Sequence, residues 1–355
     1  MTAPTVYNGL MTAPLCRIPM ILLVCTSIAP AADVLPVRKP AKGIWISRTE
    51  VLRLPTSGAA WKRLEKAADS TPPTPELRDQ NQSTNVTVLA KALVFARTGK
   101  ERYRREVRGL CMAAIDTERG GRTLALGREL AAYVIAADIV GLDKAQDRRF
   151  RAWLIRALTQ NLSGRTLRST HEKRPNNWGT HAGASRMAVA LYLGDQKELQ
   201  RAARVFKGWL GDRKAFAGFK YGDLDWQADP SSPVGINTKG ATKNGHLIDG
   251  VLPDDMRRGG GLRFPPEKTQ YAWEALQGAV VQAEILHRAG YDAWEWQDRA
   301  LLRAVEFLYR IDWKAEGDDR WQIWLINRRY GARFPAPEKT RPGKNMGWTD
   351  WTHSG

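Results

Sequence analysis

Apolar residues recur at helical spacing through most of this chain, and this pattern constrains the fold more than any other feature. It is clearest in about nine segments, at 86–97, 103–115, 124–140, 150–158, 178–193, 199–210, 271–289, 293–309 and 321–330. Gly99, Gly141, Gly211 and Gly290 follow such segments, where a left-handed residue commonly ends a helix. The strand signal is sparse. We therefore predict an all-α chain of antiparallel helix pairs, arranged as a bundle, a solenoid or a closed ring of hairpins.

Residues 211–270 depart from this pattern, because they are rich in Gly, Pro, Asp, Asn and Lys and show little periodicity. Aromatic residues such as Phe216, Trp226 and Phe264 lie within the segment and argue against disorder. Long loops in a compact domain are commonly functional. We predict ordered loops, with a short hairpin among them, over a helical scaffold.

The first 32 residues have the features of a secretory signal peptide. Arg17 precedes an apolar run at 21–24, and the small-residue triplet at 29–31 resembles a cleavage site. The apolar stretch is too short to span a bilayer. The prediction is a signal peptide at 1–32 and a single catalytic domain at 33–355, secreted or periplasmic and with no membrane partner after cleavage. The mature chain would keep Cys111 as its one cysteine and form no internal disulfide.

The charge balance points to an anionic partner. The formal net charge is +18, and the sequence contains 14 Trp. Such a surface attracts polyanions, whether nucleic acid, acidic polysaccharide or anionic lipid. Indole rings stack on bases and on the apolar faces of sugars.

The first candidate motif is R-P-N-N-W-G-T-H-A-G, which opens one of the predicted helices. Asn176 or Asn177 is a natural N-cap after Pro175. His181 would share a helical face with Asn177, so that an amide and an imidazole project together. Two interpretations remain open at this point: a capped helix with a core histidine, or a carboxylate-binding site.

The second candidate motif is D-G-V-L-P-D-D-M-R-R-G-G-G, followed by Tyr271 at the start of a long helix. Arg257 and Arg258 beside glycines provide guanidinium groups on backbone that can approach a ligand closely. The alternative is a solvated surface turn.

Taken together, these motifs resemble those of the alginate-lyase-like polysaccharide lyases. The shared features are N-N-x-x-x-H, D-G-x-L-P-x-x-x-x-R-G and a Tyr that opens a helix with A-x-x-A-x-x-x-A-E. The runs G-I-W-I-S, W-E-A-L-Q-G and K-N-M-G-W-T-D-W are most similar to polysaccharide lyase family 38, whose members cleave glucuronan or mannuronan. The resemblance implies an incomplete (α/α) toroid of antiparallel helix hairpins, with long ordered loops over a cleft.

The resemblance also implies roles for individual residues. Asn177 and Arg258 would neutralise the substrate carboxylate, Tyr271 would transfer the proton, and His181 would act as base or charge neutraliser. Further substrate-binding candidates are Asn176, Trp178, Arg257, Arg174, Lys173, Arg128, Trp226 and Lys243. For the charged members of this set the alternative is plain surface charge, and for the two tryptophans it is core packing.

The chemistry required for uronate elimination fits these residue types. Abstraction of the C5 proton becomes feasible once the adjacent carboxylate is neutralised, as in an oxyanion hole. Positive charge near Tyr271 would favour its phenolate as the base. In β-1,4-linked glucuronate and mannuronate, H5 and O4 lie on the same side of the ring, so one tyrosine can serve both. We expect syn elimination of β-1,4-polyuronate, with glucuronan favoured, mannuronate-specific alginate lysis as the alternative, and guluronate disfavoured.

Two rival functions are less favoured. A glycoside hydrolase would use two carboxylates, such as Asp223 or Asp225 with Asp254 or Asp255. A polyanion-binding protein would explain the charge and the tryptophans without catalysis. We expect an acidic polysaccharide substrate, no nucleic-acid partner, a monomer, no cofactor and no metal, since the five histidines form no close ligand pair.

Overall fold

The computed structural model describes residues 1–5, 9, 35, 41–336 and 338–354. Leu35–Gly355 form one compact unit, and the account below concerns that unit. The predicted signal peptide at 1–32 lies outside the described residues, apart from Met1–Thr5 and Gly9. Within the described ranges, no helix is long and apolar enough to cross a membrane.

The described chain is all-α, as predicted, with 55% helix and 2% strand. Its α-helices are α1 (Arg48–Arg53), α2 (Gly58–Asp69), α3 (Thr84–Thr98), α4 (Glu101–Ala114), α5 (Thr123–Val140), α6 (Lys144–Thr159), α7 (Leu167–Lys173), α8 (Asn177–Leu193), α9 (Gln196–Trp209), α10 (Pro253–Met256), α11 (Tyr271–Arg288), α12 (Trp296–Arg310), α13 (Trp321–Tyr330) and α14 (Thr349–Thr352). The remaining regular elements are the strands β1 (Thr242–Lys243) and β2 (His246–Leu247) and the 3-10 turns η1 (Arg257–Gly259) and η2 (Gly317–Asp319).

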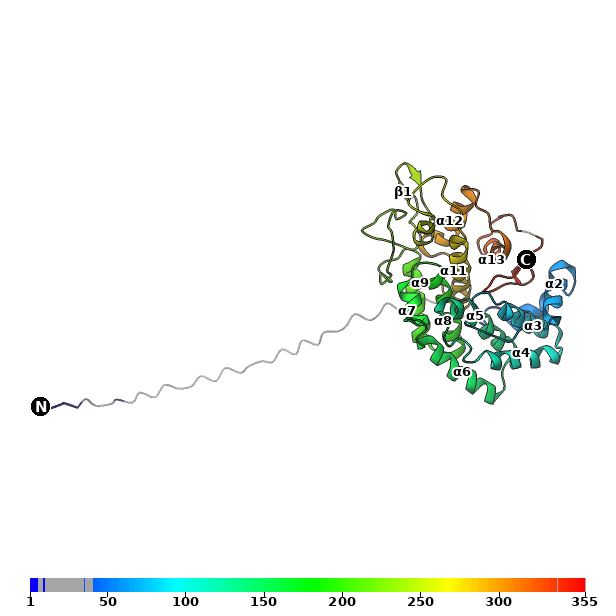
Figure 1. The fold of residues 1–355 in the computed structure, drawn as a ribbon, viewed down its shortest axis with the longest axis horizontal. Helices are drawn as coiled ribbons and strands as arrows, with labels where there is room; N and C mark the ends of the chain where they lie inside the picture. The colour runs from blue at the N-terminus through cyan, green and yellow to red at the C-terminus, as the bar shows by residue number, and fades with distance from the viewer. Residues whose placement is uncertain (6–8, 10–34, 36–40, 337, 355) are drawn as a thin grey trace. The chain divides into compact units, whose positions relative to one another are not determined.

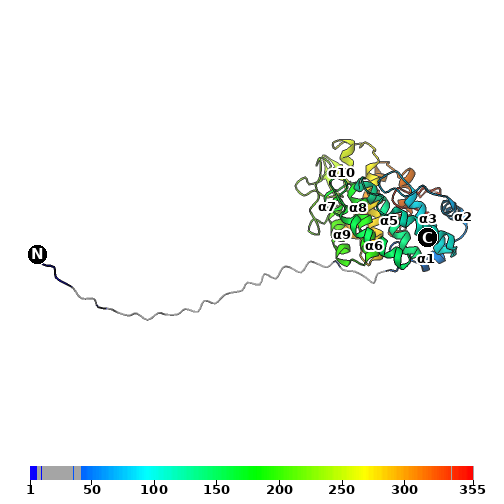
Figure 2. The same ribbon diagram turned by 60° about the horizontal axis from the view of Figure 1, so that its bottom comes forward.

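Four helices form the interior of the unit. α3, α5, α8 and α11 are buried on almost every side. They pack in chain order, α3 on α5, α5 on α8 and α8 on α11, and α13 then packs on α11. Figure 1 and Figure 2 show α5 and α8 side by side in both views. A helix that is apolar all round belongs in a core, so these sequences determine which helices lie inside.

The other long helices cover this interior. α2, α4, α6, α9 and α12 each bury one face and expose polar residues on the other. α2 and α4 pack on α3, α9 packs on α8, and α12 packs on α11. The alternation of inner and outer helices is that of a toroid-like all-α fold.

Small residues let the inner helices approach closely at the middle of the unit. A Cβ added to Gly127 on α5 would lie 2.9 Å from the backbone nitrogen of Ala182. A Cβ added to Gly278 on α11 would lie 2.5 Å from the backbone nitrogen of His181. At His181, α8 therefore packs closely between Gly127 of α5 and Gly278 of α11, and the His181 side chain is buried.

The apolar periodicity predicted the bounds of some helices more closely than those of others. The segment 321–330 matches α13, whereas 150–158 is the end of a helix that begins at Lys144. That earlier start is set by Asp143, whose carboxylate accepts hydrogen bonds from the backbone N–H groups of Ala145 and Gln146. The pattern missed the short helices α1, α7, α10 and α14.

Residues 211–270 are mostly irregular, as predicted, and contain the antiparallel hairpin β1–β2, with Thr242 opposite Leu247. In Figure 1 the loop that carries β1 lies beside α12. The contact is made by Arg303 of α12, whose guanidinium binds the carboxylate of Asp249 and the carbonyl oxygen of Asn237. The loop region is thus fixed to the helical scaffold.

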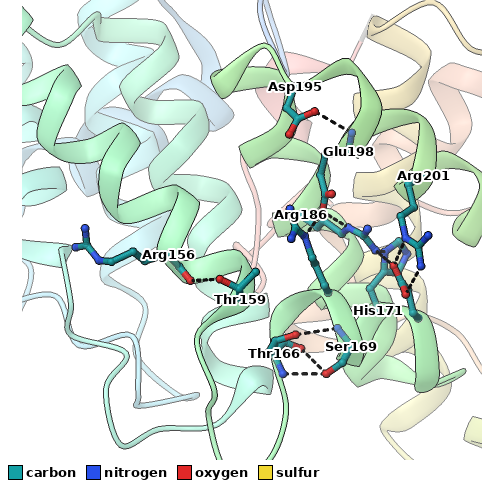
Figure 3. A network of polar contacts seen from close by, with 11 residues as sticks. Arg156, Thr159, Thr166, Ser169, His171, Arg186, Asp195, Glu198 and Arg201 are labelled. Carbon is teal, nitrogen blue, oxygen red and sulfur yellow. Dashed lines mark hydrogen bonds and ion pairs between the residues drawn. The ribbon is translucent and has the colours of Figure 1, made fainter.

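A buried ion-pair network anchors α7, α8 and α9 to one another (Figure 3). Arg186 of α8 is fully buried and donates to Glu172 at 2.9 Å and to Glu198 at 2.7 Å. Burial opposes the ionisation of Glu172, but hydrogen bonds from Arg201 and Arg186 outweigh it and lower its pKa to about 2. This network fixes α7 to α8, and the first motif begins in the short connection 174–176 between these two helices.

Candidate active site

The N-terminus of α8 is tied to α10 by two neighbouring carboxyl groups. Asn176 is the N-cap, and its side-chain oxygen accepts from the backbone N–H of Trp178. Its Nδ2 donates to Asp254 at 2.9 Å, while the backbone N–H of Asn177 donates to Asp255 at 3.1 Å. Helix α8 thus begins where the sequence predicts, and α10 lies against its first residues.

Arg258, which follows α10 directly, lies against the ring of Tyr271. The Arg258 guanidinium carbon is 3.8 Å from the centroid of the Tyr271 ring, which is close for a cation–π contact. Arg257 turns away and binds Asp254, with Nε 2.7 Å from the carboxylate oxygen. Of the two adjacent arginines, Arg258 is the exposed one.

A third contact joins the amide of Asn177 to the first turn of α11. Its Nδ2 donates to Glu274 Oε2 at 2.9 Å, and Nη2 of Arg128 donates to the same oxygen at 2.7 Å. The other Glu274 oxygen lies 3.7 Å from Lys344 Nζ. Since Glu274 follows Tyr271 by one helical turn, this contact brings α5, α8 and α11 to one place.

His181 lies one helical turn after Asn177 on α8 and is buried. Neither of its ring nitrogens has a hydrogen-bond partner in the described part of the chain. Its burial, followed by the charges of Arg128 and Lys344, holds its pKa well below the usual value. His181 is therefore neutral at physiological pH and offers a hydrogen-bond donor rather than a positive charge.

The two carboxyl groups of α10 differ in their environment. Burial, reinforced by the charge of Asp254, raises the pKa of Asp255 well above its usual range. Asp254 instead accepts hydrogen bonds from Arg257, Asn176 and the backbone N–H of Gly222. Asp254 is occupied by these three donors, and Asp255 is buried and accepts from the backbone N–H of Asn177, which disfavours the pair as the acid and base of a glycoside hydrolase.

Three other arginines and Asp254 lie near Arg174. Burial lowers the pKa of Arg174, and the charges of Arg165, Arg257 and Arg258 lower it further, so these three arginines lie within electrostatic range of Arg174. Arg174 also lies over the Trp178 ring, 5.5 Å from its centroid. Lys173 is exposed beside them. This is an anion-attracting surface next to Tyr271 and Arg258.

A cleft of about 480 Å³ opens at Glu274 and Lys344. Its other lining residues are Lys268, Thr269, Gln270, Trp273, Asp312, Trp313, Lys314, Glu316, Gly317, Asp318 and Asp319. A cavity of this volume is in the range that accommodates small ligands. Glu274 and Lys344 line this cleft and also belong to the group of contacts around the Asn177 amide, whereas Asn177, Arg258 and Tyr271 are not among its lining residues.

Two predicted substrate contacts lie elsewhere. Trp226 is 1% exposed, donates to the carbonyl oxygen of Gly260 and packs on Phe264, so its indole belongs to the core. Lys243 donates to the carbonyl oxygen of Gln227 at 2.9 Å and helps hold the loop. Core packing, the alternative for Trp226, is therefore favoured. Lys243 is a structural cation of the loop, which neither the predicted substrate contact nor plain surface charge describes.

The lyase site predicted from sequence did not include Glu274 or Lys344, and Asp255 was a candidate only for the glycoside-hydrolase alternative. The available signal was the spacing of Glu274, one turn after Tyr271 on the same helix. Nothing in the sequence relates Lys344 to that helix. In the described ranges, no group of three or more His, Cys, Asp or Glu residues is placed to hold a metal ion.

Comparison with known families bears on this geometry. Residues 87–217 match the family model described as alginate lyase. The match runs from α3 to the loop after α9 and supports an alginate-lyase-like chain. It includes Arg128, Asn177 and His181, whereas Arg258 and Tyr271 lie beyond it. A search of curated proteins found no match.

Proposed function

We propose that this alginate-lyase-like protein is a polysaccharide lyase that cleaves β-1,4-linked polyuronate by syn β-elimination. The observation that carries the proposal is the convergence of Asn177, Arg258 and Tyr271, which come from three separate segments. Asp255 of α10 accepts a hydrogen bond from the backbone N–H of Asn177. Arg258 follows α10 directly and lies over the Tyr271 ring. Glu274, on the same helix as Tyr271, accepts a hydrogen bond from the Asn177 side chain.

The reaction follows from these groups. The Asn177 amide and the Arg258 guanidinium bind the substrate carboxylate and stabilise the negative charge that grows on it. The Tyr271 phenolate removes the C5 proton, the electron pair of that bond forms the C4–C5 double bond, and the C4–O4 bond breaks. Tyr271 then returns the proton to O4. Neutral His181, buried beside this cluster, adds hydrogen-bonding capacity without a charge.

Glucuronan is the favoured substrate because the runs G-I-W-I-S, W-E-A-L-Q-G and K-N-M-G-W-T-D-W are most similar to polysaccharide lyase family 38. Polymannuronate is the second candidate, favoured by the description of the family that matches 87–217. The two polymers share the syn relation of H5 and O4. The arginines around Arg174 would attract either chain. The proposal includes a secreted or periplasmic monomer.

Tyr271→Phe tests the proposal. Removing the hydroxyl removes the group that accepts and returns the proton, so turnover should fall at least about a hundredfold. Binding of the polymer should change little, because the ring and its contact with Arg258 remain. Turnover is followed by the ultraviolet absorbance of the C4–C5 double bond, and binding by calorimetry.

Tyr309→Phe is the matched control. This tyrosine lies on α12, packs on Trp273 and Phe334, and is not near Arg258 in the chain or in the described contacts. The control variant should keep wild-type turnover. Retained activity in Tyr271→Phe would refute the proposed role of Tyr271.

A further inference from the structure

Glu274 is a carboxylate placed at the centre of a site that must bind another carboxylate. Its side chain is 13% exposed and contacts the Asn177 amide, the Arg128 guanidinium and the Lys344 ammonium group. Arg128 is only 4% exposed. A negative charge here would weaken substrate binding unless it served another purpose.

The orientation of the Asn177 amide provides that purpose. An ionised carboxylate accepts hydrogen bonds and donates none, so Glu274 requires the NH₂ end of the amide to face it. Glu274 uses one of the two Nδ2 protons, at 2.9 Å, and leaves the second for another acceptor. The Asn177 Oδ1 atom is buried and has no partner in the described part of the chain. The reversed amide would place this oxygen against Glu274, where two acceptors repel each other.

The charges around Glu274 make this arrangement compatible with an anionic substrate. Arg128 and Lys344 carry two positive charges against the single negative charge of Glu274. The group therefore remains attractive to a uronate carboxylate. Arg258 adds a further positive charge on the side of Tyr271.

We propose that Glu274 is a positioning residue, which fixes the Asn177 amide with its free N–H directed to the uronate carboxylate. This inference rests on the proposed function and extends it to a residue outside the matched family segment. Because Glu274 acts through Asn177, replacing Glu274 should lower kcat only in a protein that still has Asn177. An ion pair with a merely structural role would act independently of Asn177.

A double-mutant cycle separates these two roles. Glu274→Gln, Asn177→Ala and the combined variant are compared with wild type for kcat and KM on the uronan that wild type cleaves. Glu274→Gln should lower kcat about tenfold to a hundredfold, because a partly misdirected donor forfeits part of the transition-state stabilisation. KM should change less than about threefold. The combined variant should be no slower than Asn177→Ala alone.

Glu106→Gln is the matched control. Glu106 is also a partly exposed glutamate paired with a buried cation, Lys91, at 2.5 Å, and it lies on the outer helix α4. This variant removes the same charge and should keep wild-type kcat. Glu274→Gln leaves Arg128 without its carboxylate partner. If that variant fails to fold, the double variant Arg128→Gln with Glu274→Gln restores the charge balance. The double variant should show the same loss of kcat.

Two results would overturn the inference while wild type is active: wild-type kcat in a folded Glu274→Gln or in the charge-balanced variant, or losses that multiply in the combined variant.

If wild type eliminates no uronan, the proposed function itself fails, and the environment of the Asn177 side-chain amide is then measured directly by NMR. In that case the Asn177 side-chain NH₂ signal, identified by its absence in Asn177→Ala, should shift and lose exchange protection in Glu274→Gln. An unchanged signal would overturn the inference.

Discussion

Burial decides the protonation state of several side chains in and around the candidate site. His181 and Asp255 are each about 1% exposed, and burial drives both toward their neutral forms. In the proposed site, the positive charge available to a uronate carboxylate then comes from Arg128, Arg258 and Lys344. The site therefore retains its attraction for a carboxylate without depending on a histidine proton.

Glu129 shows the same effect outside the site. It follows Arg128 on α5, is fully buried, and its two side-chain oxygens have no hydrogen-bond partner in the described ranges. Burial, followed by the charge of Asp79, raises its pKa to about 9. Its folded-state pKa is above its unfolded value, so its contribution to stability is complete below about pH 4.5 and is lost as the pH rises toward 9.

Glu129→Gln should therefore stabilise the protein at neutral pH. The amide imitates the protonated acid, and the unfolded variant no longer gains free energy by ionising. We expect the free energy of unfolding to rise by about 1–3 kcal/mol at pH 7, with the difference vanishing near pH 4.5. Denaturant unfolding at the two pH values measures this. Equal stabilisation at both would show that ionisation of Glu129 is not involved.

The sequence motifs indicate the residue types of the candidate site but not the partners of these residues. Asn177, Arg258 and Tyr271 belong to motifs whose spacing is visible in the chain, so their proximity could be expected from the resemblance. Lys344 lies more than sixty residues further along the chain, and its proximity depends on the whole fold. Burial is equally invisible, which is why Trp226 could not be distinguished from an exposed sugar platform.

At the scale of elements, the site depends on how closely α8 and α11 approach. Asn177 and His181 lie on α8, and Tyr271 and Glu274 lie on α11. Gly278 lies against the backbone of His181 at the crossing. A displacement of one helix would therefore separate the amide from both the tyrosine and the glutamate.

Gly278→Ala should destabilise the protein and reduce turnover. The added methyl group would lie 2.5 Å from the His181 nitrogen, so the helices must move apart. We expect a loss of about 1–3 kcal/mol in the free energy of unfolding, together with a fall in kcat.

Gly109→Ala on α4 is the control for this variant. No atom lies within 4 Å of a Cβ added to Gly109, so helix propensity alone should act and stabilise slightly. Thermal unfolding and turnover of the two variants make the comparison. If Gly278→Ala is as stable as Gly109→Ala, close packing at the α8–α11 crossing is not what positions the site.

Helix length determined which elements could be predicted. The inner helices are long and apolar on most faces, so their periodicity stands out. α7 and α10 have only 7 and 4 residues, too few to establish a period. Both are held by tertiary contacts, α7 by the Arg186 network and α10 by the N-terminus of α8.

At the scale of the whole molecule, the inner and outer helices form a scaffold whose ends carry the chemistry. The first motif precedes α8, the second follows the loop region, and Tyr271 begins α11, so chain-distant residues meet at one place. The net charge of +18 is in part concentrated there, in the arginines around Arg174. A polyanion would be guided to the same place at which the amide, guanidinium and phenol meet.

The most direct test of elimination is to incubate the protein with pure glucuronan, polymannuronate and polyguluronate and follow the ultraviolet absorbance of the C4–C5 double bond. A single tyrosine that both removes and returns the proton predicts rising absorbance with glucuronan, polymannuronate or both, and none with polyguluronate. New reducing ends without absorbance would indicate hydrolysis, and no product from any of the three polymers would contradict a polyuronate lyase.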